Sequence, residues 1–427
     1  MHSLARSHSH FIRVVKIVTA IMFGACGSGG AQPLVLHSSS PPSGSRTMTA
    51  TIPSRSEGAP TANPRADSPS SLPSTPSPSE TQYLYTADAG NNTISGFKVN
   101  RDGSLTPGIS GGTASPSIVR GAAADTLLVG NAALEVFAVN ASTGAIQPTQ
   151  TATPGPADLA IDASGEFAYR ININPCQAGS CRDISAYRVV NGTVQSLGGE
   201  AAKEGGTGPH RGAPVNALFE AVDPVGRYLF IAGSPAPGPT PGVEFRAITR
   251  NADGTLGAIS PRERDLCANV AQMAAVSSGN VSFVYNSCGR DQMIQWTVFN
   301  ASSGSVVSSG QTLTSATPEP LAVDSSGHYL LAGDTTGNAV EVYAINQATG
   351  TLTPVQQIAA GNHPSSITFD ASSQFVYVTN WGSNNLSAYR FSHGSLQPIG
   401  VYSTGQAPES VTIVKPWREK RSTASKK

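Results

Sequence analysis

The chain has 427 residues, with 27 basic and 27 acidic side chains, so its formal net charge is zero. This balance gives no electrostatic reason to expect nucleic acid or an anionic membrane surface as the main partner. Only 13% of the residues are charged, whereas 44 are glycine and 31 are proline. This composition favours an all-β protein that is rich in turns.

The first 26 residues have the pattern of an export signal. A basic segment precedes the apolar run 17–25, which is far shorter than the ~20 residues that a membrane-spanning helix needs. The run ends in Gly24-Ala25-Cys26, and small residues before a cysteine resemble the bacterial lipobox, in which the cysteine is acylated. We therefore expect an exported protein of the bacterial cell envelope (periplasm or outer membrane), anchored to a membrane through lipid on Cys26. An ordinary secretory signal with an incidental cysteine is the alternative.

Residues 27–80 are predicted to be a disordered linker, because prolines alternate there with Ser, Thr and Ala and apolar residues are sparse. The basic segment 417–427 is predicted to be a solvated, disordered tail. The folded part is therefore expected at residues 81–416.

Four cysteines remain after Cys26, an even number that predicts two disulfides in an exported protein. We expect local pairing of Cys176 with Cys181 and of Cys267 with Cys288. A zinc site is the rival interpretation, but the spacing lacks paired C-x-x-C motifs and no histidine lies nearby. The sequence therefore predicts neither a metal nor a cofactor.

Two phrases recur along the folded part. The first is an apolar strand of period two, then Asp and Gly, then a strand with an aromatic residue; it is seen at 159–169, 222–230, 321–329 and 367–377. Asp and Gly at that place indicate a tight hairpin turn. The second phrase is a strand, a turn that ends in glycine, and another strand. Its glycines are Gly103, Gly144, Gly192, Gly254, Gly304, Gly350 and Gly394.

Seven units of about four strands each predict a seven-bladed β-propeller. The first unit begins at Tyr83, in the position of a second strand, and residues 408–414 have the form of an inner strand. We therefore expect the C-terminal strand to complete the first blade and close the ring. A solenoid would need no such permutation, and a two-sheet sandwich would not repeat seven times.

The segment Tyr377-Val-Thr-Asn380, together with the Gly-x-Leu-x-Pro turns, resembles the bacterial lactonase-type seven-bladed propellers. That family includes 6-phosphogluconolactonases and carboxymuconate cyclases, and the resemblance covers residues 81–416. It implies a lactonase site in which a histidine-containing stretch leads into an inner strand, with Arg and Glu from neighbouring blades. The nearest stretches here are 208–212, which contains His210 and Arg211, and His363-Pro364.

Both kinds of regular turn should fall on one face of the propeller, which leaves the irregular loops and any site on the other face. The segments that lead into inner strands there offer Glu319, His363 and Glu409. A histidine near carboxylates can act as a general acid–base catalyst on a lactone carbonyl. The alternative is that these are ordinary solvent-exposed loop residues.

Other candidates have two interpretations each. Arg120 stands where other blades have Ile161, Val323 or Phe369, and it either binds an anionic substrate or oxyanion or pairs with a carboxylate inside the fold. Glu220, aligned with Leu159, must likewise find a partner or face the channel. Trp381 either stacks on a ligand or fills space between blades.

Second strands end in Asp or Asn in nearly every blade. The functional interpretation is a polar ring that includes Asn380 and binds substrate, but capping and turn formation explain the repetition better. The members are Asp88, Asn131, Asn172, Asn286, Asp334 and Asn380.

The sequence thus favours a monomeric lactonase-like hydrolase that acts on a small-molecule lactone. The second hypothesis is a non-catalytic propeller that binds a protein or glycan at the cell envelope. The chain has no nucleotide-binding loop, and nothing in it predicts the strand-to-helix elbow that carries a nucleophilic serine in a Gly-x-Ser-x-Gly motif, so serine-nucleophile chemistry is not supported.

Overall fold

The computed structural model describes residues 81–113, 116–123, 125–131, 133–152, 156–176, 179–197, 216–234, 243–260, 264–267 and 270–414. The expected signal, linker and basic tail lie outside these residues, as do Cys26, His210 and Arg211. The strands all belong to the compact unit Ser74–Lys427. None of the described segments forms a helix long and apolar enough to cross a membrane.

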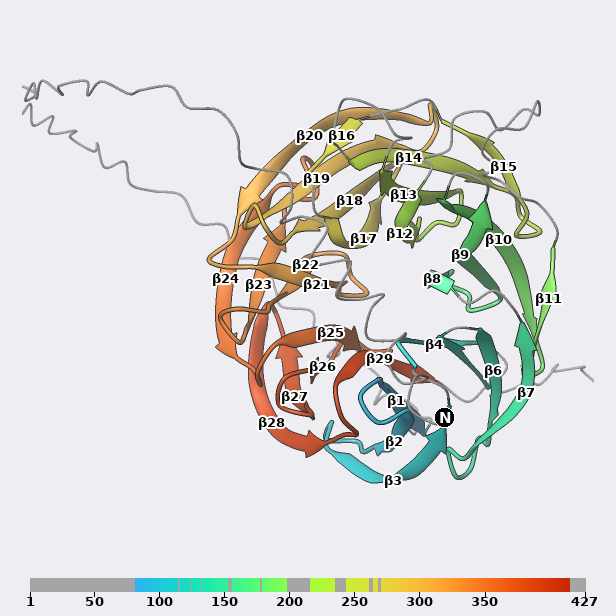
Figure 1. The fold of residues 1–427 in the computed structure, drawn as a ribbon. Helices are drawn as coiled ribbons and strands as arrows, with labels where there is room; N and C mark the ends of the chain where they lie inside the picture. The colour runs from blue at the N-terminus through green and yellow to red at the C-terminus, as the bar shows by residue number, and fades with distance from the viewer. Residues whose placement is uncertain are drawn as a thin grey trace, which may run out of the picture. The chain divides into compact units, whose positions relative to one another are not determined.

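Seven antiparallel sheets stand around a central axis, so the prediction of a seven-bladed propeller is confirmed (Figure 1). From the axis outward, blade 1 contains β29 (Pro408–Val414), β1 (Gln82–Asp88), β2 (Thr93–Val99) and β3 (Leu105–Gly112). Blade 2 contains β4 (Ile118–Ala122), β5 (Thr126–Gly130), β6 (Leu134–Val139) and β7 (Ile146–Ala152). Blade 3 contains β8 (Pro156–Ile161), β9 (Phe167–Cys176), β10 (Gly179–Val190) and β11 (Thr193–Ser196).

The remaining blades follow the same order. Blade 4 contains β12 (Asn216–Val222), β13 (Tyr228–Ser234), β14 (Val243–Arg250) and β15 (Leu256–Ile259), and β16 (Arg264–Leu266) also pairs with β14. Blade 5 contains β17 (Val270–Ser278), β18 (Val281–Cys288), β19 (Met293–Asn300) and β20 (Ser305–Leu313). Blade 6 contains β21 (Pro318–Val323), β22 (Tyr329–Asp334), β23 (Ala339–Ile345) and β24 (Leu352–Ala359). Blade 7 contains β25 (Pro364–Phe369), β26 (Phe375–Asn380), β27 (Asn385–Ser392) and β28 (Ser395–Ser403).

The aspartate of the first recurring phrase fixes the turn between the first two strands of a blade. In blade 7 the Asp370 carboxylate accepts the backbone N–H of Phe375 at 2.8 Å, and in blade 6 Asp324 accepts that of Tyr329 at 2.8 Å. Both carboxylates are buried. The hydrogen bonds replace the water that a buried carboxylate loses, which explains why the turn repeats with this residue.

The turn glycines of the second phrase join neighbouring blades. Gly103 has a φ of +85°, and a Cβ there would lie 2.1 Å from the ring of Phe375, which packs over it from blade 7. Two residues after the packed ring, a buried tyrosine donates its hydroxyl to the carbonyl of the same glycine. These bonds run from Tyr85 to Gly144 (2.6 Å), from Tyr169 to Gly254 (3.0 Å), from Tyr285 to Gly350 (2.9 Å) and from Tyr377 to Gly103 (3.0 Å). We call each of these a tyrosine–glycine bond.

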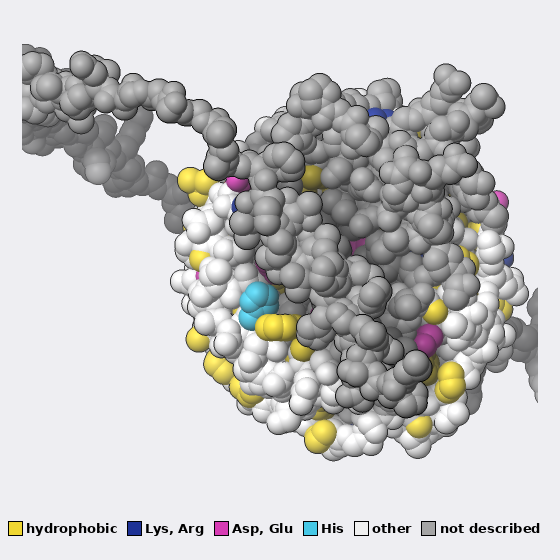
Figure 2. Space-filling model, viewed as in Figure 1, with side chains coloured by type: hydrophobic (Ala, Val, Ile, Leu, Met, Phe, Trp, Pro, Cys, Tyr) yellow, Lys and Arg dark blue, Asp and Glu magenta, His cyan; other side chains and the backbone are white. Residues whose placement is uncertain are grey.

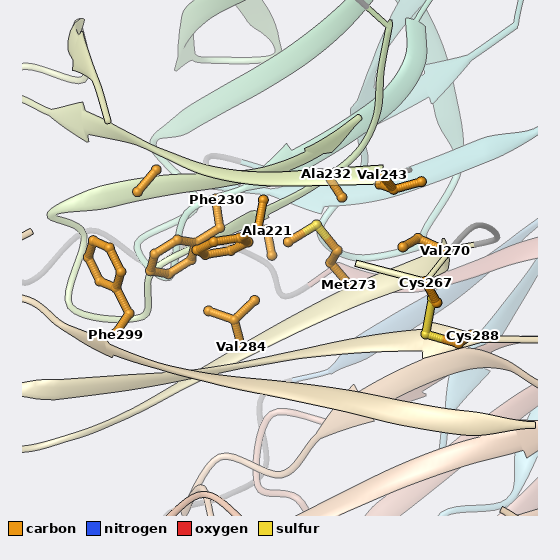
Figure 3. Packing of buried hydrophobic residues seen from close by; sticks show 12 residues of the cluster. Ala221, Phe230, Ala232, Val243, Cys267, Val270, Met273, Val284, Cys288 and Phe299 are labelled. Atoms are coloured by element: carbon orange, nitrogen blue, oxygen red, sulfur yellow. A yellow bond between two sulfur atoms is a disulfide. The ribbon is translucent and has the colours of Figure 1, made fainter. Parts of the chain in front are cut away.

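Apolar side chains fill the space between blades. Between blades 4 and 5 the rings of Phe230 and Phe299 lie edge to face at 5.2 Å, and Met273 continues this core (Figure 3). A disulfide between Cys267 and Cys288 lies in the same cluster, so that pairing is confirmed. The side chains of Cys176 and Cys181 lie outside the description, but their backbones belong to one hairpin, β9–β10.

The C-terminal strand closes the ring as expected. β29 pairs with β1 from Tyr83, opposite Val414, to Asp88, opposite Pro408. Val411 and Val414 are buried in this blade. Blade 1 therefore has four strands only because the C-terminal strand β29 pairs with the first strand of the chain, β1.

Deletion of residues 408–414 should remove the inner strand of blade 1. Burial of each valine contributes ~1.5–3 kcal/mol, so the deletion should lower the free energy of unfolding by at least ~3 kcal/mol. Urea denaturation, monitored by circular dichroism, measures this free energy of unfolding. Deletion of residues 27–80 is the control and should leave the transition in place; equal loss in both variants would contradict the closure.

Candidate functional site

One face of the propeller carries the turns between the first and second and between the third and fourth strands of each blade. The opposite face carries the turns between the second and third strands and the links between blades, and we call it the loop face. The loop face includes segments 89–92, 289–292, 335–338, 360–363, 381–384 and 404–407. Figure 2 views the molecule down its axis, and the described part of the surface there is mostly neutral, with few charged side chains.

Two of the predicted catalytic residues meet on the loop face. Glu319 lies in β21 of blade 6, and His363 directly precedes β25 of blade 7. The His363 Nε2 atom lies 4.0 Å from Glu319 Oε2, and both side chains are about half exposed. The pair therefore combines an imidazole, a carboxylate and access to solvent across one junction between blades.

The backbone of His363 is held in an uncommon conformation. Its φ is +58°, which costs energy for a residue with a Cβ and persists only where neighbours enforce it. The His363 N–H donates to Asn338 Oδ1 at 2.9 Å, and its carbonyl accepts the N–H of Trp381 at 2.9 Å. These two bonds fix the position from which the imidazole projects.

Trp381 completes a group of three predicted residues. Its side chain is 47% exposed, and its ring centroid lies 5.6 Å from that of His363. Glu319, His363 and Trp381 together are called the loop-face group below. An exposed indole next to an imidazole offers a flat apolar surface beside groups that can transfer protons.

Two opposing effects act on the pKa of the Glu319 carboxyl. Burial raises the pKa of the Glu319 carboxyl, and the positive charge of His363 partly offsets this by lowering the pKa. The Glu319 backbone carbonyl accepts the hydroxyl of Ser287 at 2.8 Å, which ties the residue to blade 5. The carboxyl can thus hold a proton at a higher pH than an exposed glutamate.

Glu409 and Asn380 take different places. Glu409 lies in β29, on the other side of β25 from Glu319 (Figure 1). Asn380 is fully buried and donates to Asn385 Oδ1 at 2.8 Å and to Ser387 Oγ at 3.0 Å, so its amide supports the turn that carries Trp381. The expected capping role is thus seen at Asn380, and its contact with a substrate stays a prediction.

Arg120 lies in β4 and links three blades. Its Nε donates to the carbonyl of Leu159 in blade 3 at 2.9 Å, and one terminal nitrogen donates to Ser410 Oγ in blade 1 at 3.1 Å. The other terminal nitrogen lies 3.8 Å from Asp158 Oδ1. The guanidinium therefore serves contacts between inner strands, the structural alternative considered for it, and its substrate-binding role stays a prediction.

Glu220 is buried beside this cluster, with only 6% of its surface exposed. Its Oε1 accepts the N–H of Ala160 at 3.1 Å, and its own N–H donates to Asp158 Oδ2 at 3.1 Å. Its Oε2 has no hydrogen-bond partner among the residues that the structure describes. Burial, followed by repulsion from Asp158, raises the pKa of Glu220 well above its usual range.

Sequence reasoning singled out Arg120 and Glu220 but missed Asp158, which touches both. A signal was present, because Asp158 follows the inner-strand proline Pro156 by two residues, where blades 7 and 1 have Ser366 and Ser410. A charge at that position is specific to blade 3. In the part of the chain that the structure describes, no three His, Cys, Asp or Glu side chains are placed to hold a metal ion.

Known families and structures agree with this architecture. Residues 254–369 match the lactonase family of seven-bladed β-propellers. The resemblance predicted from the Tyr-Val-Thr-Asn segment is therefore confirmed, and the matched residues include Glu319 and His363 of this lactonase-like propeller. No curated protein matches the sequence.

Several solved structures are similar to the lactonase-like propeller. One is a protein from Lactobacillus plantarum, with a TM-score of 0.61 and 16% identity over 78% of this chain and 99% of that chain. Another, described as a candidate 6-phosphogluconolactonase from Bacteroides uniformis, has a TM-score of 0.59 and 17% identity over 79% and 100%. A third, a candidate 6-phosphogluconolactonase from Bacteroides fragilis, has a TM-score of 0.59 and 16% identity over 80% and 100%. These similarities show the shared fold.

The buried carboxyl of Glu220 should make stability depend on pH. Its pKa in the folded state lies above the usual 4.5, so the folded protein binds a proton that the unfolded chain has already lost. Stability from this proton is complete below pH 4.5 and is lost as the pH rises through the folded-state pKa. Glu220→Gln keeps an oxygen for the Ala160 N–H and should remove this loss.

Urea denaturation of both proteins across a pH series measures the difference. The free energy of unfolding of the wild type should fall relative to that of Glu220→Gln as the pH increases. Parallel pH profiles would show that Glu220 has an ordinary pKa. The variant Glu166→Gln, on the solvent-exposed turn before β9, is the matched control and should follow the wild type.

Proposed function

We propose that this protein hydrolyses a lactone at the loop-face group. The observation that carries the proposal is the position of His363 beside Glu319, at 4.0 Å and open to solvent, with the indole of Trp381 next to it. The family match over residues 254–369 supports the same reaction class. The substrate is an unidentified small-molecule lactone.

The reaction needs one water and two proton transfers. His363 takes a proton from water as the hydroxide oxygen bonds to the lactone carbonyl carbon, which forms a tetrahedral oxyanion. The oxyanion collapses, the ring C–O bond breaks, and the departing oxygen receives the proton to give a hydroxy acid. The ionised Glu319 carboxylate stabilises the imidazolium that forms between these steps.

Trp381 has the positioning role in this scheme. Its exposed ring can cover one side of a flat lactone ring and bring the carbonyl to His363. Its backbone N–H is bonded to the His363 carbonyl, so the two rings are placed by the same contact. Loss of the indole should therefore weaken substrate binding more than it slows the chemical step.

A second candidate function rests on the same exposed indole. Trp381 is one of the few large apolar side chains that are open to solvent in the described residues. Sugar rings stack on such surfaces, so a propeller without catalytic activity that binds a glycan is consistent with this group.

The test is a panel of γ- and δ-lactones, in which a pH indicator reports the release of the hydroxy acid. General acid–base catalysis contributes about 10²–10⁴-fold, so His363→Gln should lower kcat by at least ~100-fold. Glu319→Gln should lower kcat less, and Trp381→Ala should mainly raise KM. His328 lies in the turn directly before β22. The variant His328→Gln is the matched control and should behave as the wild type.

Absence of turnover for every lactone, or an unchanged kcat in His363→Gln, would remove the enzymatic proposal. Glycan binding that depends on Trp381, found without any lactone turnover, would support the second candidate instead. Each variant is compared at equal folded concentration, as judged by its thermal transition.

We also propose that the protein is exported and anchored through lipid on Cys26. The support is the sequence pattern alone: a basic segment, a short apolar run and Gly24-Ala25-Cys26. Cys26→Ser should release the protein from the membrane fraction into the soluble fraction, as measured by immunoblotting after fractionation. Ser45→Ala, in the predicted linker, is the control and should stay in the membrane fraction; membrane retention of Cys26→Ser would argue against the anchor.

A further inference from the structure

The turn between the second and third strands ends in the same backbone conformation in three consecutive blades. Gln292 in blade 5, Asn338 in blade 6 and Asn384 in blade 7 have φ values of +48°, +55° and +53°. The backbone carbonyl of each accepts an N–H from the link that leaves the same blade. The donors are Thr314, Ala360 and Thr404, respectively. The three blades therefore offer a comparison of the side chain at one backbone position.

An asparagine at this position holds the residue that precedes the next inner strand. Asn338 Oδ1 accepts the N–H of His363 at 2.9 Å, and Asn384 Oδ1 accepts that of Ala407 at 2.8 Å. His363 and Ala407 each directly precede the proline that begins an inner strand, and their φ values are +58° and +52°. A residue with a Cβ rarely adopts this conformation unless its neighbours enforce it. The asparagine bond is the enforcing contact that the two blades share.

The entry to blade 6 has no such bond from the preceding turn. Its residue in the place of His363 is Thr317, whose N–H donates to Thr336 Oγ1 at 3.4 Å. Thr317 does not have the positive φ of the other two residues. The preceding turn there ends in Gln292, and a glutamine amide lies one methylene farther from its own backbone than an asparagine amide. The left-handed conformation thus accompanies asparagine in the turn before it.

Blades 7 and 1 differ in the side chains that this shared backbone carries. The Trp381 N–H donates to the His363 carbonyl at 2.9 Å, and the Ala89 N–H donates to the Ala407 carbonyl at 3.1 Å. Blade 1 therefore builds the same arrangement around two alanines. The backbone does not depend on an imidazole or an indole, which leaves both side chains of blade 7 for a role in the loop-face group.

We propose that Asn338 is a positioning residue for His363, and that its bond to the His363 N–H sets where the imidazole stands relative to Glu319. The catalytic part of this inference rests on the proposed function. Asn338 follows β22 and Glu319 lies in β21, so both belong to blade 6. Blade 6 thus supplies the carboxylate and also holds the histidine of blade 7 at 4.0 Å from it. A change of φ at His363 would turn its Cβ, and the imidazole with it, away from this place.

The test compares Asn338→Gln with Asn384→Gln in the full chain. Both variants receive the residue that blade 5 has in this turn, and both lose one bond to a backbone N–H, so their thermal transitions should fall equally. Only the first of these bonds holds His363. On a lactone that the wild type hydrolyses, Asn338→Gln should lower kcat by about tenfold or more, because a misplaced catalytic group loses its alignment with the substrate. Asn384→Gln should keep the wild-type kcat.

A second measurement does not depend on activity. The ring centroids of His363 and Trp381 lie 5.6 Å apart, so a nuclear Overhauser effect between the two rings, in protein with labelled histidine and tryptophan, reports their placement. The effect should be lost in Asn338→Gln and kept in Asn384→Gln. Asn338→Asp retains an acceptor oxygen at the same distance from the backbone and should also keep it.

Glycine variants cover the case in which Asn338→Gln does not fold. Glycine adopts a positive φ without strain and lacks the amide oxygen, so Asn338→Gly should lose the ring contact and Asn384→Gly should keep it. A wild-type ring contact in the Asn338 variants without the oxygen would overturn the proposal, as would an equal loss of kcat at both positions. If no lactone is hydrolysed but the ring contact depends on Asn338 alone, the proposed function fails and the positioning of His363 stands.

Discussion

The tyrosine–glycine bond is the contact on which the ring depends. A propeller blade pairs strands only within itself, so neighbouring blades must be joined by side chains. Tyr377 reaches Gly103 across the junction between blades 7 and 1, which are the two ends of the folded chain. The bond requires three things at once: a glycine without a Cβ, a ring packed on it, and a buried hydroxyl that would otherwise lack a partner. This is why glycines and aromatic residues recur at blade spacing.

That recurrence explains why the fold could be predicted. The turn glycine recurs in every blade, so Gly103, Gly254 and their equivalents report the number of blades and the need for β29 to complete the first one. The meeting of Glu319 and His363 was predictable for the same reason, since both lead into inner strands of adjacent blades. The Cys267–Cys288 bridge followed from proximity within one unit.

The contacts of single residues could not be predicted in this way. Whether Arg120 faces a ligand or the fold depends on the carbonyl of Leu159 and the hydroxyl of Ser410, which lie in other blades and follow no repeat. Asp158 was missed because its contacts with Glu220 and Arg120 lie in other blades, and the charge that sets its segment apart does not show what it touches. The repeated residues identify the scaffold. Residues such as Arg120, Asp158 and Glu220 each occur in a single blade, so no second copy in the sequence shows what they contact.

The tyrosine–glycine bonds do not occur at every junction. Blade 6 has Leu331 where the bond would start, and its junction with blade 7 is held near the rim, where the side chain of Gln356 bonds to the backbone N–H and carbonyl of Leu396. Two further bonds hold the same junction: the Tyr389 hydroxyl donates to the carbonyl of Ala359 at 2.7 Å, and the N–H of His363 donates to Asn338 Oδ1 at 2.9 Å. Blades 6 and 7 are therefore attached both at the rim and beside the loop-face group. A molecule that binds between Glu319 and His363 meets a spacing that the backbone has already set, so it does not have to order the two residues itself.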